Sequence, residues 1–210
     1  MEFGIAIVII IFSIILHEVA HGYVANWLGD PTAKYAGRLT LNPLPHIDPV
    51  GSVLIPGILA LTGASFLIGW ARPVPVNPYN LRWGKWGEAL TAFAGPATNI
   101  VIALFAALII RFGFVGLDSA VVSIIVLVIA SNLSLAILNL IPLPPLDGSK
   151  VVAAILPYQL ERQYRALENL TYALGPFGLI LILIIVFNFL SPTIGALVRY
   201  FFTLLTGVGV

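Results

Sequence analysis

Apolar runs of nearly membrane-spanning length are the feature that most constrains how this chain can fold. Residues 3–28, 89–110 and 120–139 are long apolar stretches with few charged side chains. About 20 apolar residues in an α-helix cross the roughly 30 Å hydrocarbon core of a bilayer. Charged residues make up only 9% of the 210 residues, whereas soluble domains carry roughly 25%. These runs predict an all-α polytopic membrane protein.

The remaining apolar segments are less regular. Residues 51–70 contain the helix breakers Pro56 and Gly57, and residues 175–190 and 194–205 follow later in the chain. The last two segments form either two spans or one span and a surface helix. We therefore expect a bundle of about four to six transmembrane helices, which forms a single membrane-embedded domain over residues 1–210.

The basic residues predict how the bundle is oriented. They fall in three clusters between apolar segments: Lys34 and Arg38; Arg72, Arg82 and Lys85; and Lys150, Arg162 and Arg165. Basic loops face the cytoplasm. All three clusters lie on that side if residues 51–70 enter the membrane and return, whereas a crossing by this segment would separate the first two clusters. We therefore predict that residues 51–70 form a re-entrant segment.

Three ionisable residues interrupt the first apolar run. His17, Glu18 and His21 form an HExxH pattern, in which two histidines one helical turn apart can bind one metal ion. Ionisable groups inside a membrane helix are costly and indicate a functional site. The alternatives are interhelical hydrogen bonds and a haem or quinone site. Haem fits less well, because two histidines on one helix face cannot bind opposite sides of one iron.

A third metal ligand must be a carboxylate or a histidine, because the chain has no cysteine. A zinc enzyme holds its ion with three protein ligands and keeps one position for water. Asp147 is the best candidate, since it follows a run with Pro142, Pro144 and Pro145 in which a helix must unwind. Irregular backbone at membrane depth is tolerated where it lines a cavity. Asp147 could instead only cap the segment 149–156.

These motifs together resemble the site-2 protease family of intramembrane zinc metalloproteases. That family pairs a transmembrane HExxH with a later Asp-Gly motif that follows an asparagine and prolines, as from Asn139 to Gly148 here. Residues 94–99, Ala-Gly-Pro-Ala-Thr-Asn, are similar to a small-residue helix of the same family. The resemblance covers roughly residues 5–155 and is to the compact type, because the chain has no room for an inserted PDZ domain.

The resemblance implies a role for each matching residue. His17, His21 and Asp147 would bind one Zn²⁺ ion per chain, and Glu18 would act as the general base on the attacking water. Asn139 would hold the substrate backbone or stabilise the oxyanion, although intramembrane asparagines also simply join helices.

The family also implies the reaction, the partners and the location. The expected reaction is hydrolysis of peptide bonds within or near the transmembrane segments of single-span membrane proteins, as in regulated intramembrane proteolysis. The metal-site core would span about residues 5–155, followed by carboxyl-terminal helices over residues 175–206. We expect a multi-pass protein of a prokaryotic plasma membrane with its active site toward the cytoplasm. The net charge of +1 gives no indication of a nucleic-acid partner.

Two polar segments predict a small membrane-associated β element at the cytoplasmic rim. Residues 38–41 alternate in polarity, and prolines make residues 73–76 extended. Together with residues 35–37 they could form a sheet whose edge pairs with a substrate strand.

Several other polar and aromatic residues have simpler expected roles. Asn99 and Asn132 are expected only to join helices. His46 lies in a predicted loop, where it is solvated or forms a turn, or else supports the metal site. The tryptophans are expected at the membrane interface: Trp27, Trp70, Trp83 and Trp86.

Functions of other kinds are also open to a sequence like this one. A small transporter or channel could use His17, Glu18 and His21 as a proton or metal relay, and a non-cleaving homologue could only bind membrane proteins. The proline-broken run before Asp147 favours a protease, because a relay does not need it. Two histidines and one aspartate also suit cobalt or iron.

Overall fold

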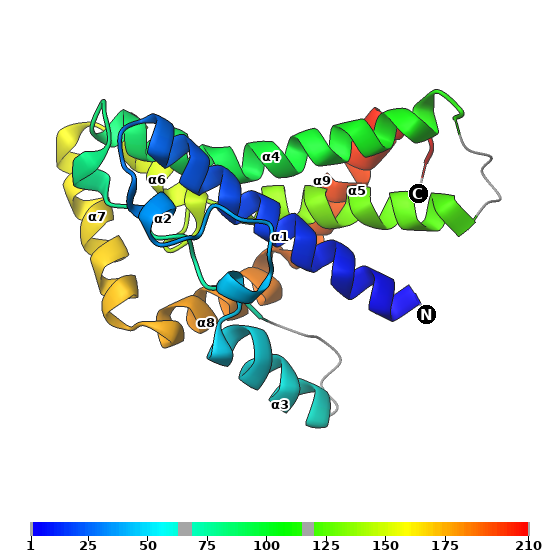
Figure 1. Cartoon of the computed structure of the whole chain (residues 1–210), viewed down its shortest axis with the longest axis horizontal. Coiled ribbons are helices and arrows are strands. Elements are labelled where there is room, and N and C mark those ends of the chain that lie inside the picture. The colour runs from blue at the N-terminus through cyan, green and yellow to red at the C-terminus, as the bar shows by residue number, and fades with distance from the viewer. Residues whose placement is uncertain (1, 63–68, 115–119, 210) are drawn as a thin grey trace.

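The computed structural model of the chain describes residues 2–62, 69–114 and 120–209, and all regular structure among them is helical (Figure 1). The α-helices are α1 Glu2–Trp27, α2 Thr32–Tyr35, α3 Ile55–Leu61, α4 Lys85–Arg111, α5 Ala120–Asn139, α6 Asp147–Ile155, α7 Tyr158–Ala173, α8 Pro176–Ile185 and α9 Ser191–Thr206. Short 3₁₀ turns cover Leu44–His46 and Pro78–Asn80, and π-helical turns cover Pro49–Leu54 and Val186–Leu190.

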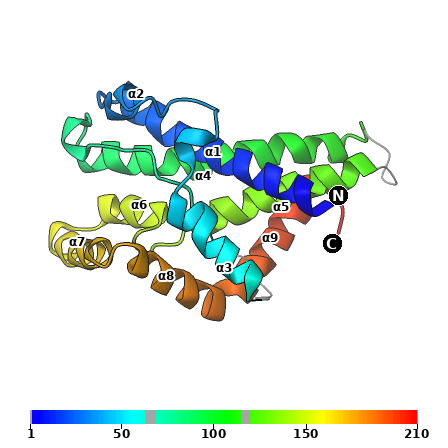
Figure 2. The same ribbon diagram turned by 60° about the horizontal axis from the view of Figure 1, so that its bottom comes forward.

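Four helices among the described residues are long and apolar enough to cross a membrane. Three of them, Gly4–Trp27, Lys85–Arg111 and Val121–Asn139, confirm the spans predicted from the sequence. The fourth, Phe177–Thr206, joins α8 and α9 into one helical path of 30 residues. Such a path is roughly 45 Å long, well above the roughly 30 Å that a membrane requires. Figure 2 shows this path bend between α8 and α9.

The directions of the helices place several segments at one end of the bundle. Helices α1 and α5 run the same way and α4 runs against them, so Trp27, Lys85 and Asn139 lie at the same end (Figure 1). Helices α6 and α7 lie at this end too, and the two chain termini lie at the other. The amino-terminal helix and the helix that leads to Asp147 are therefore parallel.

Helix α4 is the centre of the bundle, where it packs against α1, α5, α6 and α9. Its buried face carries Ala92, Gly95, Asn99, Ala103 and Ala107 at the spacing of one helix face. Small side chains let helix backbones approach closely in a membrane, where packing replaces the hydrophobic effect between helices. An apolar core then joins α4, α5 and α9: Ala103, Ala107, Ile110, Ile125, Ile129, Leu133 and Phe202.

The two ends of the segment 51–70 meet. The Trp70 amide donates to the Gly51 carbonyl at 3.2 Å, and the Ser52 hydroxyl donates to the Trp70 carbonyl at 2.8 Å. A Cβ on Gly51 would lie 2.3 Å from the Trp70 ring, so this contact requires glycine. The described helices between these ends are short, and α3 projects away from the bundle of α1, α4 and α5 (Figure 1).

The predicted β element does not form in the described part of the chain, which includes residues 35–41 and 73–76. Residues 35–41 end a short helix and continue in turns. Residues 73–76 are extended but unpaired as a strand, because Pro73 and Pro75 have no N–H groups for a ladder. The Arg38 guanidinium, rather than a backbone ladder, joins the two segments by donating to the Arg72 and Pro73 carbonyls.

A buried carboxylate, Asp30, holds the segment after residue 70 to the end of α1. Asp30 accepts hydrogen bonds from the Asn77 amide at 2.7 Å, the Asn80 side chain at 3.0 Å and the Thr32 amide at 3.2 Å. Burial tends to raise the pKa of Asp30, but these hydrogen bonds outweigh it and hold the pKa below its ordinary value. Asp30 is therefore charged in the folded protein and ties two distant segments together.

We predict that Asp30→Ala destabilises the protein by about 1–3 kcal/mol, because the hydrogen bonds from Thr32, Asn77 and Asn80 to this buried carboxylate are lost. Thermal unfolding in detergent measures the effect, and Asn42→Ala, which removes one exposed turn hydrogen bond to the Leu44 amide, is the control. Since folding lowers the pKa of Asp30, its contribution is complete above a pH of about 4 and is lost as the pH falls below that value. The difference between wild type and Asp30→Ala should therefore shrink in acid; a difference independent of pH would contradict this account.

Candidate metal centre

Helix α1 presents His17 and His21 one turn apart toward the interior of the bundle. Both side chains are buried, with 5% and 8% of their surface exposed. Their rings meet edge to face with centroids 4.6 Å apart. The apolar sequence around them forms a membrane helix, so these two imidazoles are polar groups that must find partners inside the protein.

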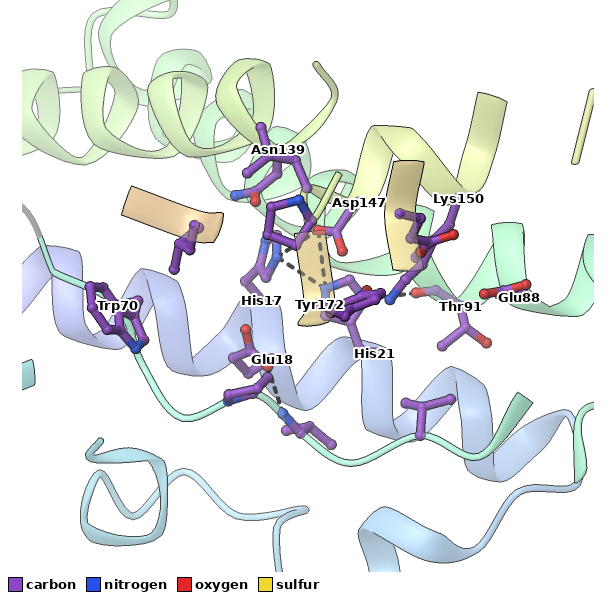
Figure 3. Close-up of a pocket in the computed structure, with 18 of the residues that line it drawn as sticks. His17, Glu18, His21, Trp70, Glu88, Thr91, Asn139, Asp147, Lys150 and Tyr172 are labelled. Carbon is purple, nitrogen blue, oxygen red and sulfur yellow. Dashed lines mark hydrogen bonds and ion pairs between the residues drawn. The ribbon is translucent and has the colours of Figure 1, made fainter. Parts of the chain in front are cut away.

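Asp147 brings a carboxylate to the same point. Its Oδ2 atom lies 3.1 Å from His17 Nε2 and 3.3 Å from His21 Nε2, and the two Nε2 atoms are 3.0 Å apart (Figure 3). Asp147 is the first residue of α6 but makes no capping hydrogen bond there. The structure thus gathers the predicted residues within 4.8 Å of one another and directs the carboxylate toward the histidines rather than to a helix cap.

The irregular run between α5 and α6 sets where Asp147 lies. A Cβ on Gly148 would lie 2.2 Å from the Leu140 carbonyl oxygen, so the first turn of α6 packs directly on this run. The Tyr164 hydroxyl of α7 donates to the Pro142 carbonyl at 2.6 Å. The prolines prevent the helix from continuing, and the close contact at Gly148 returns the chain toward α1.

The donors and acceptors at this point fit a cation. His21 Nδ1 lies 2.7 Å from the Thr91 carbonyl, which can only accept, so this nitrogen carries the proton and Nε2 carries a lone pair. His17 Nδ1 lies 2.6 Å from the Asn99 side-chain oxygen and is likewise a donor. Two lone pairs and a carboxylate therefore converge. Two histidines and a carboxylate are a known zinc ligand set with an open fourth position.

Gly95 of α4 makes room for the imidazoles. A Cβ at this position would lie 2.5 Å from His21 Nε2 and 2.6 Å from His17 Nε2. Only glycine allows α4 to approach α1 so closely at the height of the two histidines.

Glu18 lies beside His17 on the cavity wall and is held by backbone. Its Oε2 atom accepts a hydrogen bond of 2.9 Å from the Val74 amide (Figure 3). Prolines have no N–H, so in the run Pro73-Val74-Pro75 only Val74 can donate. The extended segment thus orients the carboxylate through one amide and leaves Oε1 for other partners.

The site opens into a cavity of about 640 Å³ that is lined by the three candidate ligands, Glu18 and Asn139. The Asn139 side chain donates to the Leu135 carbonyl of its own helix at 2.9 Å, and Figure 3 shows it above the ligand set. Helix α1, the extended segment after residue 70, and helices α4, α6 and α7 surround this space. The candidate ligands therefore face a cavity rather than closely packed protein.

The cavity is also lined by ionisable residues that the sequence did not indicate as part of the site. Lys150, Glu88, Glu168 and Tyr172 line it. Burial tends to lower the pKa of Lys150, but the surrounding Tyr172, Asp147, Glu88 and Glu168 outweigh it and raise that pKa. Lys150 is therefore a cation near the site, one helical turn after Asp147. That spacing along α6 is the signal that could have identified it.

The structure shows which contacts His46 and Trp70 make. His46 is buried, and its Nε2 pairs with the Thr40 carbonyl at 2.9 Å, so of the roles expected for it the structure shows that of a turn-forming residue. Trp70 packs on Gly51 and lines the cavity. Trp27 and Trp83 are mostly exposed and meet edge to face 6.2 Å apart.

We predict that Gly95→Ala weakens metal binding, because the added methyl group forces the imidazoles apart. Overpacking of this kind costs about 1–3 kcal/mol, which corresponds to a roughly 5- to 150-fold loss of zinc affinity. The zinc content and zinc affinity of the purified protein measure the effect. Gly195→Ala is the control, because the nearest atom to its Cβ would be the end of the Arg199 side chain at 3.5 Å. Equal affinities for the two variants would contradict the prediction.

Comparison with known proteins agrees with this geometry. The family model described as "Peptidase family M50" matches residues 113–185, which include Asn139 and Asp147. Two relatives carry the name "Putative zinc metalloprotease": YwhC of Bacillus subtilis and Rip2 of Mycobacterium tuberculosis. YwhC is 38% identical over 162 residues, which cover 72% of this chain and 68% of YwhC. Rip2 is 29% identical over 182 residues, which cover 87% of this chain and 65% of Rip2.

The chain thus spans about two-thirds of the length of these relatives. No solved structure matches it significantly. The identity with YwhC and the match of the family model lead to one conclusion: this chain belongs to peptidase family M50, the site-2 protease family.

Proposed function

We propose that this chain is an intramembrane zinc metalloprotease that hydrolyses peptide bonds within or near the transmembrane segments of single-span membrane proteins. The observation that carries the proposal is the convergence of two imidazole lone pairs and a carboxylate beside Glu18, inside a membrane helix. The names of the relatives supply the metal, because YwhC and Rip2 are both named as zinc metalloproteases.

His17, His21 and Asp147 would hold the zinc ion. When bound, zinc polarises a substrate carbonyl and lowers the pKa of a bound water molecule. Glu18 would take the proton of the attacking water at Oε1, while the Val74 amide holds Oε2 in place. The same carboxylate would then deliver the proton to the amine that leaves.

Asn139 would contact the substrate. Its side chain lines the cavity that contains the candidate ligands, so its amide can bind the backbone of a peptide placed there. A peptide bond in a helix has its carbonyl engaged in the helical hydrogen-bond ladder. Substrates would therefore unwind before cleavage, and the cavity of about 640 Å³ would receive the unwound segment.

Two observations favour proteolysis over a proton or metal relay. The run from Asn139 to Asp147 folds back on itself at Gly148 to place a third ligand, which a relay through His17 and His21 does not require. Among the described residues, α1 contributes only His17, Glu18 and His21 to the cavity, so this cavity does not extend along the rest of that helix. The intact set of His17, Glu18, His21 and Asp147 likewise supports an active enzyme over a non-cleaving homologue.

The meeting of the ends of residues 51–70 supports one arrangement of the chain in the membrane. Because Trp70 returns to Gly51, the segment would enter the membrane and leave on the same side as a re-entrant loop. The basic clusters would then face the cytoplasm, and so would the active site. The whole chain would act as one domain of a multi-pass protein in a prokaryotic plasma membrane.

We predict that Glu18→Gln abolishes cleavage but keeps the zinc ion, because the amide cannot accept the proton of water while the ligands are unchanged. The expected loss of rate is on the order of 10²- to 10⁴-fold. The test is cleavage of a co-expressed single-span membrane protein, together with the zinc content of the purified enzyme. His17→Ala is the matched variant and should lose both cleavage and zinc. Cleavage that persists in Glu18→Gln would overturn the mechanism.

We predict that single cysteines at Lys34 and Arg82 react with a membrane-impermeant reagent from the same side of the membrane. The native chain contains no cysteine, so each variant carries one reactive group. A cysteine at Phe112, at the other end of α4, should react from the opposite side. Reaction of positions 34 and 82 from opposite sides would show that residues 51–70 cross the membrane instead.

A further inference from the structure

A line of buried polar side chains lies behind His17, away from the cavity. Asn99 of α4 and Asn132 of α5 have no exposed surface, and Ser13 of α1 is 5% exposed. Asn99 Nδ2 donates to Asn132 Oδ1 at 2.8 Å, and Asn132 Nδ2 donates to the Ser13 hydroxyl at 2.9 Å. These groups link α1, α4 and α5 at membrane depth.

The direction of each hydrogen bond in this line follows from one carbonyl. Asn132 Nδ2 lies 2.9 Å from the Val128 carbonyl, which can only accept, so the amide oxygen of Asn132 must point the other way, toward Asn99. That oxygen needs a donor, so Asn99 presents its NH₂ group to it. A second carbonyl, of Ser13, lies 3.4 Å from the same NH₂ group and favours the same orientation.

The orientation of Asn99 then decides which ring nitrogen of His17 carries the proton. With its NH₂ group on Asn132, Asn99 presents Oδ1 to His17 Nδ1 at 2.6 Å. An amide oxygen only accepts, so Nδ1 carries the ring proton. In a neutral imidazole the other nitrogen then has the lone pair. That nitrogen, Nε2, is the atom that faces His21 and Asp147.

We propose that Asn99 is a positioning residue for the metal site, and that Asn132 fixes its orientation. The Val128 carbonyl orients Asn132, and Asn132 orients Asn99. Asn99 then holds His17 with its Nε2 lone pair toward the ion. The proposal rests on the metal site proposed above. It differs from a role in joining helices, because a joining hydrogen bond has no preferred direction relative to His17.

The other histidine shows why a side chain is needed here. His21 receives the same support from the Thr91 carbonyl, whose direction is set by the backbone of α4. His17 lies where α4 presents a side chain instead, and an asparagine can turn either way unless its neighbours fix it. Groups that hydrogen-bond to the ring nitrogen that does not bind the metal typically change metal affinity by roughly 10- to 100-fold.

The test compares zinc affinity with thermal stability in the full-length protein in detergent. Asn99→Leu, which has a similar size but no acceptor, should lower zinc affinity by roughly 10- to 100-fold and change the visible spectrum of the cobalt-substituted protein. Asn99→Asp keeps an acceptor for His17 but places an oxygen against Asn132 Oδ1. This variant should lose thermal stability and yet keep a zinc affinity close to that of wild type.

Asn132→Leu tests whether Asn132 orients Asn99, because this variant leaves Asn99 in place but allows its side-chain amide to turn. We expect a fall in zinc affinity smaller than that of Asn99→Leu. Thr98→Val is the control on the same helix, since the Thr98 hydroxyl bonds only to the Ala94 carbonyl of α4. Its affinity should match that of wild type.

A different result would show that Asn99 only joins helices. In that case Asn99→Leu unfolds at a lower temperature but binds zinc with an affinity within about twofold of wild type, which is far less than the expected loss. An unchanged zinc affinity in Asn132→Leu would overturn the proposal that Asn132 fixes the orientation of Asn99. A zinc-binding His17→Ala variant would instead overturn the metal site, so the two failures are distinguishable.

Discussion

The close approach of α1 and α4 at Gly95 is the contact on which the rest of the site depends. Because Gly95 has no side chain, both imidazoles of α1 lie directly against the backbone of α4. One turn before Gly95, the backbone of α4 supplies the Thr91 carbonyl to His21, and one turn after Gly95, Asn99 contacts His17. A larger residue would separate the helices and remove both partners, so one missing methyl group permits the buried polar arrangement.

Polar groups in the membrane interior must find partners within the protein, and this requirement organises the bundle. Each imidazole has a partner at its outer nitrogen and faces Asp147 with its inner one. Glu18 is held by Val74, and Asp30 holds the following part of the same extended segment. The carboxylates of Glu18 and Asp30 thus hold the segment 74–77 in place by hydrogen bonds, without a β-sheet. The cavity wall beside the site is built from these side-chain contacts.

Much of the fold follows from patterns that are local in sequence. The apolar runs predicted the first three spans, and the HExxH spacing placed His17 and His21 on one face of α1. The predictions failed where partners distant in sequence decide the outcome. Residues 73–76 were expected to pair as a strand, but Glu18 and Arg38 take their backbone groups.

The sequence by itself determined which chemical groups are present, and in what spacing along each helix, because helical periodicity and the cost of charge in lipid act locally. It therefore indicated the two histidines, the neighbouring glutamate and the proline-broken run before Asp147. Only the tertiary structure decided which nitrogen of each histidine faces Asp147. That choice depends on Thr91, Asn99 and Asn132, which come from helices distant in the chain and meet His17 and His21 only when the bundle packs.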